Sequence, residues 1–162
     1  MYYQNLIPSP LGDLVVIASD EHLLMLEFAD SGELAEKLAR FPDAKSGTNI
    51  LLKQTEQELR EYFEWKRKHF DIPLSVDGTD FQKYAWKWLE KIPYSETRSY
   101  WEQARMIGRA KAVRAIGGAN HNNRIVIIIP CHRVIGASGK LVGYGGGMER
   151  KIWLLEHEKK NK

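Results

Sequence analysis

Cys131 is the only cysteine in the 162-residue chain, and its neighbours are of the kinds that activate a thiol. It lies in the stretch IPCHRVIGASG, after Pro130 and directly before His132 and Arg133. An ordinary thiol has a pKa of about 8.5, so a cysteine nucleophile needs a neighbour that stabilises its thiolate. The pattern is therefore interpreted as a nucleophile with His132 as its base. A small, inert core cysteine after an isoleucine-rich run remains the alternative at this point.

A histidine base also needs a partner that fixes its orientation. The terminal segment MERKIWLLEHE contains the nearest acidic residues of this part of the chain, and Glu158 is the best placed to be held by helix packing. Successive residues of a helical turn point about 100° apart. His132 is therefore expected to reach the sulfur of Cys131 through a water or a relay, and not directly.

A glycine-rich segment, VGYGGG at residues 142–147, follows the cysteine. Tyr144 stands there among Gly143, Gly145 and Gly146. The Lys-Ser/Thr ending of a P-loop is missing, which argues against ATP binding. Because glycine lets the backbone approach a ligand closely, we interpret the segment as a pocket wall that closes over a flat ligand.

Charge divides the chain into two parts. Residues 1–78 carry 8 Lys and Arg against 14 Asp and Glu, a balance of −6, whereas residues 79–162 carry 16 against 7, a balance of +9. Between Arg98 and Arg133 there is a single acid, Glu102. Such an asymmetry indicates nucleic-acid contact by the basic part, with a solvated basic face as the alternative.

Two short helices are predicted in this basic part. The first, SYWEQARMIG, begins with the capping-box pair Ser99 and Glu102 and ends at Gly108. The second, RAKAVRAIGGAN, follows almost at once and ends in two glycines. Their close succession favours a helix-turn-helix, although helical hairpins of other kinds are common.

The second helix is expected to carry Arg109, Lys111 and Arg114 among unusually small residues. These small residues are Ala110, Ala112, Ala115, Gly117, Gly118 and Ala119. A helix is about 10–12 Å across with its side chains, and a minor groove about 6 Å wide, so a thin helix needs the least groove widening. We interpret this helix as a minor-groove element without sequence preference, from which Arg114 can enter the base stack. Close packing of helices is the alternative explanation for the small residues.

The remaining pattern supplies the elements that position these groups. The runs LGDLVVIASD and HLLMLEFAD predict a β-hairpin that turns near Asp20 and Glu21. SGELAEKLARFP predicts a short helix with Ser31 as its cap, and NILLKQTEQELREYFEWKRK a longer amphipathic one. TDFQKYAWKWLEKI predicts a third helix with a capping box from Thr79 to Gln82. Its apolar face is assigned to Phe81, Tyr84, Ala85, Trp88, Leu89 and Ile92.

The break at residues 69–80 places a boundary between a domain of residues 1–78 and one of residues 79–162. With one cysteine no internal disulfide can form, which fits a reducing compartment. The five histidines show no metal-ligand spacing, so we expect no structural metal. No apolar stretch is long enough for a membrane span, and the first residues lack the pattern of a secretory signal.

Several motifs together resemble the O6-alkylguanine-DNA alkyltransferases. They are IPCHRVI, the upstream RAIGGAN, the downstream GYGGG and KIWLLEHE, the lead-in FQKYAWKWLEKIPYSETRSY, and the N-terminal SPLGDLVVIASDEHLLMLEF. The resemblance covers nearly the whole chain. It implies an α/β N-terminal domain of ribonuclease-H-like fold, an antiparallel hairpin sheet plus helices, followed by a mainly α C-terminal domain with a helix-turn-helix.

The same resemblance implies direct-reversal DNA repair. A protein of this family binds double-stranded DNA in the minor groove, flips O6-alkylguanine out and transfers the alkyl group irreversibly to its own cysteine. The family works without a cofactor, and we expect a monomer in the cytoplasm, or at the nucleoid of a prokaryote. Several residue roles follow by motif: Cys131 as alkyl acceptor, His132 as water-linked base, Glu158 as its orienting carboxylate, Asn123 as buttress of the active-site turn, Tyr100 as aid to nucleotide rotation, Arg114 as the inserted finger, and Tyr144 with its glycines as the guanine pocket.

Three positions depart from the family pattern. Arg124 stands where proline usually follows the asparagine, Val113 replaces a second alanine before the finger, and Trp101 is bulkier than the usual residue after the tyrosine. Two other functions remain as alternatives. One is a damage sensor of the alkyltransferase-like class, which lacks the acceptor cysteine, and the other is a thiol hydrolase or redox enzyme using Cys131 and His132. The second predicts repeated turnover and does not explain the small-residue helix.

Overall fold

The structure, a computed structural model, describes residues 1–109, 111–136, 139, 144 and 146–162. The chain forms two compact units, Met1–Val76 and Asp77–Lys162. Gly143 and Gly145, both assigned to the pocket wall from the sequence, lie outside the described residues. In the described part no helix is long and apolar enough to cross a membrane.

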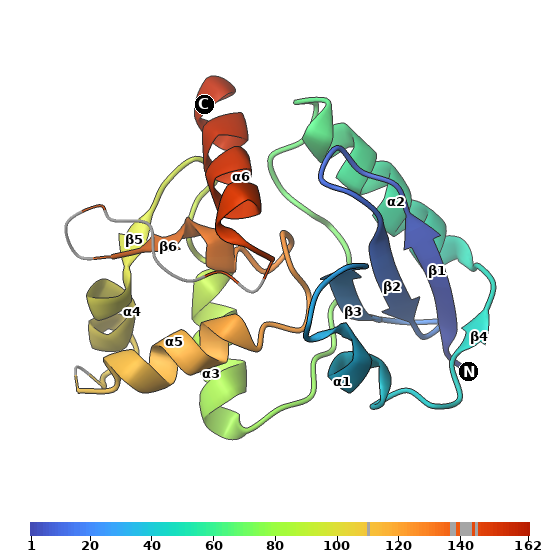
Figure 1. Ribbon diagram of the computed structural model, residues 1–162, viewed down its shortest axis with the longest axis horizontal. Coiled ribbons are helices and arrows are strands. Elements are labelled where there is room, and N and C mark those ends of the chain that lie inside the picture. Colours follow the sequence, from blue (N-terminus) through green and yellow to red (C-terminus); the bar gives the residue numbers. More distant parts are fainter. Residues whose placement is uncertain (110, 137–138, 140–143, 145) are drawn as a thin grey trace. The chain divides into compact units, whose positions relative to one another are not determined.

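The first unit contains a four-stranded sheet in the order β3-β2-β1-β4 (Figure 1). The strands are β1 (Tyr3–Ile7), β2 (Leu14–Ala18), β3 (Leu23–Phe28) and β4 (Lys45–Ser46). β2 pairs antiparallel with both β1 and β3, and β4 runs parallel to β1. The expected hairpin is confirmed as β2–β3. β1 was not expected from the sequence, because the alternation of apolar residues in YQNLI is weak. In the structure four of its five residues are exposed or half-buried.

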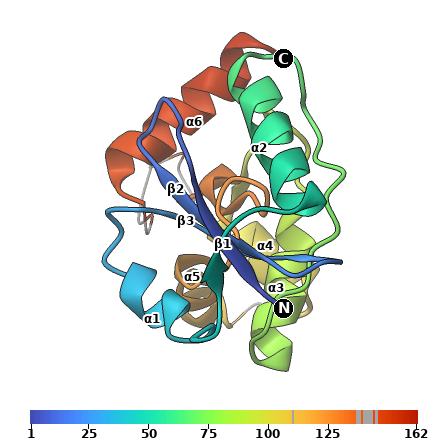
Figure 2. The same cartoon turned by 90° about the vertical axis from the view of Figure 1, so that its right-hand side faces the viewer.

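All residues of β2 are buried, so both faces of the sheet are covered. α1 (Leu34–Leu38) contributes to the cluster around Val15, Ile17 and Met25, and α2 (Ile50–Phe63) packs against β2 (Figure 2). The expectation that Ser31 caps the short helix is wrong. The helix begins later, after Glu33, and the Ser31 hydroxyl instead accepts a hydrogen bond from the Glu33 amide at 3.1 Å.

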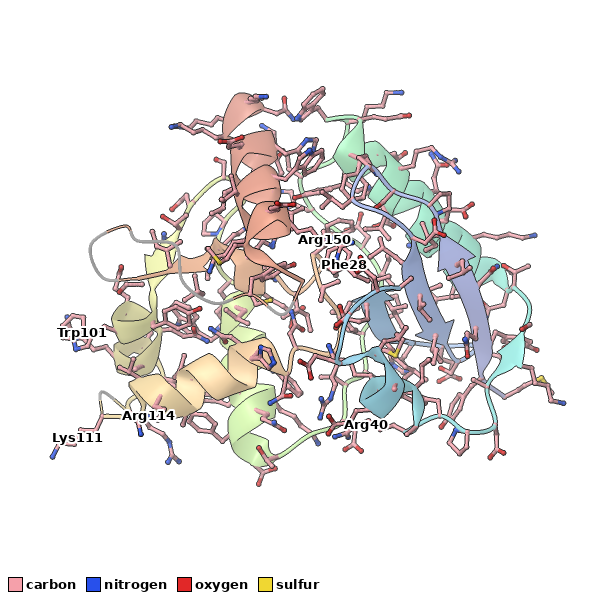
Figure 3. The ribbon with its side chains drawn as sticks, in the orientation of Figure 1. Phe28, Arg40, Trp101, Lys111, Arg114 and Arg150 are labelled. Carbon is pink, nitrogen blue, oxygen red and sulfur yellow. The ribbon has the colours of Figure 1, made fainter. Side chains whose placement is uncertain are left out.

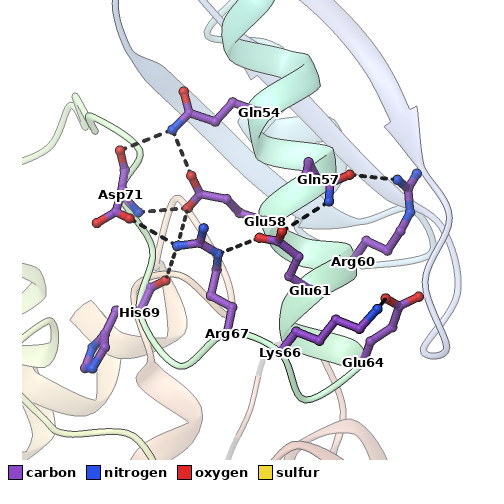
Figure 4. A network of polar contacts seen from close by, with 10 residues as sticks. All are labelled: Gln54, Gln57, Glu58, Arg60, Glu61, Glu64, Lys66, Arg67, His69 and Asp71. Carbon is purple, nitrogen blue, oxygen red and sulfur yellow. Dashed lines mark hydrogen bonds and ion pairs between the residues drawn. The ribbon is translucent and has the colours of Figure 1, made fainter.

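Arg67 ties the segment after α2 back onto that helix (Figure 4). Its guanidinium donates to Glu61 Oε1 at 2.9 Å, to Asp71 Oδ2 at 3.1 Å and to the carbonyl of His69 at 2.8 Å. Glu58, buried on α2, accepts from the Asp71 amide at 2.8 Å. These contacts hold residues 67–71 in place without involving Cys131.

The second unit is mainly helical, as the sequence predicted (Figure 1). Its elements are α3 (Asp80–Leu89), β5 (Arg98–Ser99), α4 (Tyr100–Met106), α5 (Val113–His121), the 3₁₀ turn η1 (Cys131–Arg133), β6 (Val134–Ile135) and α6 (Met148–Lys160). α5 packs against both α3 and α4. β5 and β6 pair in parallel, which brings the start of α4 beside the end of the cysteine turn.

The capping boxes expected at the starts of α3 and α4 are confirmed. The prediction of which residues form the apolar face of α3 is partly wrong. Tyr84 is 56% exposed, whereas Trp86 is 1% exposed and belongs to the core. Helical periodicity does not predict the burial of Trp86, because residues distant in the sequence cover its indole.

The second helix of the helix-turn-helix is shorter than predicted. α5 begins at Val113, so Arg109 and Lys111 lie in the connection before it and Arg114 alone of the three cations is helical. The two glycines, Gly117 and Gly118, lie inside the helix and do not end it. Gly108 has a φ of +75° and follows the last turn of α4, as expected for a left-handed helix stop.

Candidate active site

Cys131 begins the turn η1 and is buried, with 6% of its surface exposed. The amide nitrogen Nδ2 of Asn123 donates to Cys131 Sγ at 3.2 Å and to the carbonyl of Ile129 at 2.7 Å. Asn123 Oδ1 accepts from the amide of Ile125 at 3.0 Å. The Asn123 side chain thus joins both ends of the apolar run and presents a donor to the sulfur.

The apolar run before Pro130 is a compact turn. Ile127 has a φ of +72°, which is unusual for a β-branched residue. The amide of Ile129 donates to the carbonyl of Ile125 at 3.0 Å and closes the turn. Because all five residues from 125 to 129 are buried, packing holds this strained backbone directly before the thiol.

His132 and Glu158 are wholly buried and 2.7 Å apart, measured from Nε2 to Oε2. Arg133 reaches the same carboxylate, with Nε 2.9 Å from Oε1 and Nη2 3.1 Å from Oε2. The amide of Ser95 donates to Oε1 at 3.2 Å. Arg133 also donates from Nη1 to the carbonyl of Ile92 at 2.8 Å. Glu158 on α6 therefore joins η1 to the segment before β5.

Burial lowers the pKa of His132, although Glu158 opposes that effect, so the imidazole is neutral near pH 7. Burial alone would raise the pKa of Glu158, but His132 and Arg133 outweigh it and hold this pKa well below its usual value. A carboxylate only accepts hydrogen bonds. His132 must therefore carry its proton on Nε2, which leaves Nδ1 as the basic nitrogen. Nδ1 is buried and has no hydrogen-bond partner among the described residues.

Tyr100 and Lys151 also lie close to the cysteine turn. Lys151 is wholly buried, donates from Nζ to the carbonyl of Val134 at 2.5 Å, and lies 5.8 Å from the ring centroid of Tyr100. Burial, and secondarily the charge of Cys131, raises the pKa of Tyr100. Burial lowers the pKa of Lys151 to about 8, while the charge of Cys131 opposes that shift. Both residues therefore lie near enough to Cys131 for its charge to change their pKa.

Tyr144 is half-buried, and its hydroxyl oxygen is buried. Gly146 accepts a hydrogen bond at its carbonyl from Arg150 Nη1 at 3.2 Å. Gly147 has a φ of +95°, a conformation that glycine adopts without strain, and it directly precedes α6. Gly147 thus leads directly into the helix that carries Glu158 and Lys151.

The predicted DNA-binding cations lie on the surface of the same unit, in α5 and in the connection before it. Arg109, Lys111 and Arg114 are exposed, and Figure 3 shows Lys111 and Arg114 projecting outward. A methyl group added at Gly117 or Gly118 would meet no described atom within 4 Å. Close helix packing therefore does not explain these glycines. Ala112 precedes α5 and is half-buried.

The departures from the family pattern occupy different places. Trp101 is 49% exposed, projects from α4 (Figure 3), and lies beneath the guanidinium of Arg105, 4.6 Å from its ring. Val113 is partly exposed at the start of α5. Arg124, in contrast, is buried beside Asn123.

The sequence interpretation missed Ser95 and Lys151 as members of this site, and it placed Arg133 beside the thiol without its contact with Glu158. Lys151 and Glu158 are seven residues apart on one helix, a spacing that places both on one face, so this signal was present. The Ser95 amide gave no signal, because a backbone donor has no residue type. Among the described residues no cluster of His, Cys, Asp or Glu could hold a metal ion.

Comparison with known proteins establishes the family. Residues 80–160 match the model described as 6-O-methylguanine DNA methyltransferase, DNA binding domain, and residues 1–76 match that family's ribonuclease-like domain. The chain therefore belongs to the 6-O-methylguanine DNA methyltransferase family. Its two units have the expected order, a sheet with helices followed by a helical DNA-binding domain.

Individual relatives cover nearly the whole chain. A methylated-DNA–protein-cysteine methyltransferase of Methanosarcina barkeri is 43% identical over 161 residues, which is 99% of each chain. The protein of that name from Mycobacterium tuberculosis is 44% identical over 159 residues, 98% of this chain and 93% of the relative. The crystal structure of Mycobacterium tuberculosis OGT in complex with DNA has a TM-score of 0.88 at 42% identity and covers 99% of this chain and 93% of that chain.

Proposed function

We propose that this protein repairs O6-alkylguanine in double-stranded DNA by moving the alkyl group irreversibly to Cys131. The observation that carries this proposal is the placement of the Cys131 sulfur. It receives a hydrogen bond from Asn123 and lies in the same turn as a neutral His132 whose proton position is set by Glu158. A methylated-DNA–protein-cysteine methyltransferase requires such an activated thiol.

The transfer is a single displacement. The Cys131 proton passes through a water to His132 Nδ1, and the resulting imidazolium is stabilised by the Glu158 carboxylate. The thiolate attacks the alkyl carbon, a new S–C bond forms, and the C–O6 bond breaks with its electron pair going to the guanine. The guanine, which remains part of the DNA strand, then takes up the proton that the imidazolium holds, so the thiol proton ends on the repaired base. The thioether product has no leaving group, which makes each molecule usable once.

Tyr100 and the glycine-rich segment are proposed to receive the flipped nucleotide. The half-buried Tyr100 lies near Cys131, where its hydroxyl can donate to the departing base and stabilise the charge that develops on it. Tyr144 and Gly146, with Gly143 and Gly145, would form the wall of the guanine pocket. Base flipping costs a few kcal/mol, and insertion of Arg114 into the stack offsets part of that cost.

DNA binding is assigned to the domain of residues 79–162, and residues 1–78 are assigned a structural role. At Gly117 and Gly118 the surface of α5 carries no side chain and an added methyl group would meet no described atom. The nearby cations Arg109, Lys111 and Arg114 are exposed. A thin helix with cations in and before its first turn fits a minor groove and contacts phosphates without reading bases. We therefore propose sequence-independent binding, by a monomer, with strong salt dependence.

Mass spectrometry tests this function directly. Wild-type protein mixed with duplex DNA containing O6-methylguanine should gain the mass of one methylene on Cys131, stoichiometrically and without turnover. The Cys131→Ser variant, and wild type with undamaged duplex, should stay unmodified. Tight binding with an unmodified Cys131 would instead indicate a damage sensor, and repeated turnover would indicate a thiol hydrolase.

A further inference from the structure

Arg124 is a buried arginine directly after Asn123, with 7% of its surface exposed. Its Nε donates to the carbonyl of Asp77 at 3.1 Å, and its Nη1 donates to the carbonyl of Asn122 at 3.1 Å. The guanidinium carbon lies 5.1 Å from the ring centroid of Trp86. A planar guanidinium that bonds two carbonyls and also lies over a ring is restricted to one orientation.

The surface on which Arg124 lies is itself fixed. The indole nitrogen of Trp86 donates to the carbonyl of Ala119, near the end of α5, at 2.7 Å. The backbone at Gly78 approaches the same ring so closely that a methyl group there would lie 2.8 Å from two ring carbons. Trp86 thus connects α3 with α5 and with the first residues of the unit, and Arg124 is anchored to that assembly.

Asn123 lies between Asn122, whose carbonyl this guanidinium binds, and the backbone of Arg124 that carries the guanidinium. Asn122, before it, accepts a hydrogen bond at its carbonyl, and Arg124, after it, supplies the guanidinium. Residues 122–124 lie outside the helices and strands. The amides of Asn122 and Asn123 donate to carbonyls at the end of α5, and the Arg124 guanidinium adds the contacts with Asp77 and the Trp86 ring. The clamp therefore adds a backbone restraint to the hydrogen bonds with Ile125 and Ile129 that direct the Asn123 amide toward Cys131 Sγ, 3.2 Å from Nδ2.

We propose that Arg124 is a positioning residue for Cys131, whose guanidinium clamps the backbone on both sides of Asn123 and so holds the Asn123 amide against the sulfur. Proline, usual at this position in the family that the sequence resembles, restricts the backbone covalently. Arg124 restricts the same loop through its side chain. The inference rests on the proposed function for its effect on alkyl transfer, but its effect on the thiol can be measured separately.

The test compares wild type with Arg124→Ala in two reactions. The first is alkylation of Cys131 by iodoacetamide across the pH range of thiol ionisation, and the second is alkyl transfer from O6-alkylguanine as a free base. The pH midpoint of the first reaction should move to higher pH, because the thiolate loses a well-placed donor. The rate of the second near pH 7 should fall about tenfold, within the range that a misplaced supporting group costs.

Arg67→Ala is the matched control. Arg67 also ties a loop carbonyl to a helix, but in residues 1–76, so its loss should lower the free energy of unfolding and leave the pH midpoint of Cys131 unchanged (Figure 4). Arg124→Lys keeps the charge, but an ammonium group is not planar and cannot bind both carbonyls while lying flat on the ring. The pH midpoint of Cys131 alkylation in this variant should therefore lie between those of wild type and Arg124→Ala.

A wild-type midpoint in folded Arg124→Ala overturns the proposal. If the alanine variant does not fold, a wild-type midpoint in folded Arg124→Lys does the same, and so does an equal shift in Arg67→Ala. Alkylation by iodoacetamide needs neither DNA nor alkylguanine. Failure of the wild type to accept a methyl group from DNA would therefore overturn the proposed function and leave this test intact.

Discussion

His132 Nε2 lies 2.7 Å from Glu158 Oε2, and no part of either side chain is exposed. Arg133 and the Ser95 amide occupy the remaining acceptor positions of that carboxylate. The pair fixes which imidazole nitrogen carries the proton and leaves Nδ1 as the base. It also places an ionised carboxylate in the interior, where its stability depends on its partners.

Glu158→Gln should weaken both the fold and the reaction. The amide cannot balance the charge of Arg133, so the free energy of unfolding should fall by about 3 kcal/mol. The alkyl-transfer rate should fall by about 100-fold, since His132 loses the group that stabilises its imidazolium. Urea unfolding and single-turnover kinetics measure the two effects. Glu156→Gln, an exposed change on the same helix, is the control, and equal rates in both variants would contradict the role of Glu158.

Acid should remove the contribution of Glu158 to stability. Its pKa in the folded protein is held below the ordinary value of 4.5. The stabilisation is therefore complete above about pH 4.5, where the unfolded carboxyl is also ionised, and is lost as the pH falls through the folded pKa. The difference in unfolding free energy between wild type and Glu158→Gln should shrink below that pH. A difference that stays constant or grows on acidification would contradict this assignment.

Lys151 should make the protein more stable in moderately alkaline solution. Its pKa is about 8 in the folded protein and 10.5 in the unfolded chain. Between these values the unfolded state binds more protons, so the free energy of unfolding rises with pH, by up to about 3 kcal/mol. Lys151→Met should lack this rise in a series of unfolding curves from pH 8 to pH 10.5. Parallel pH profiles for the two proteins would show that Lys151 does not titrate in this way.

Arg114→Ala should impair repair of duplex DNA more than reaction with an alkylguanine base. Arg114 is exposed on α5 and belongs to none of the hydrogen bonds described around Cys131. A free base needs no flipping, so its rate should stay near that of wild type, whereas the duplex rate should fall about tenfold or more. Single-turnover rates with duplex DNA and with the free base show whether Arg114 acts only on the duplex. Arg60→Ala, exposed on α2, is the control, and equal slowing of both substrates would remove the finger role.

Gly117→Leu should weaken DNA binding without unfolding the protein. A side chain at this position meets open space in the described structure, so the fold can accept it. The added bulk would separate α5 from the minor groove, and we expect the dissociation constant to rise at least about tenfold, or about 1.4 kcal/mol. Fluorescence anisotropy with labelled duplex measures it. Gly32→Leu, also into open space but in the other unit, should bind normally, and unchanged binding by Gly117→Leu would contradict the proposed docking face.

Local patterns predicted the elements well where short-range chemistry decides them. The capping boxes at Thr79 and Ser99 and the stop at Gly108 depend on residues within one turn, and all three are present. The start of α5 was predicted too early, because alanine and arginine favour a helix at residues 109–112 whether or not one forms. β1 was not predicted, because its strand conformation is stabilised by pairing with β2 and β4 and not by a pattern in its own sequence.

The sequence by itself determined which chemistry is available: one thiol, a histidine beside it, a carboxylate on the last helix, and a basic, small-residue helix pair. Residue type and spacing carry that information directly. The tertiary structure alone decided which groups meet. It brought Glu158 to His132 and Arg133 across more than twenty intervening residues, buried Lys151 near the thiol, and placed Arg124 over Trp86. These contacts arise from the packing of distant segments, and each contact's strength depends on burial, which no local pattern records.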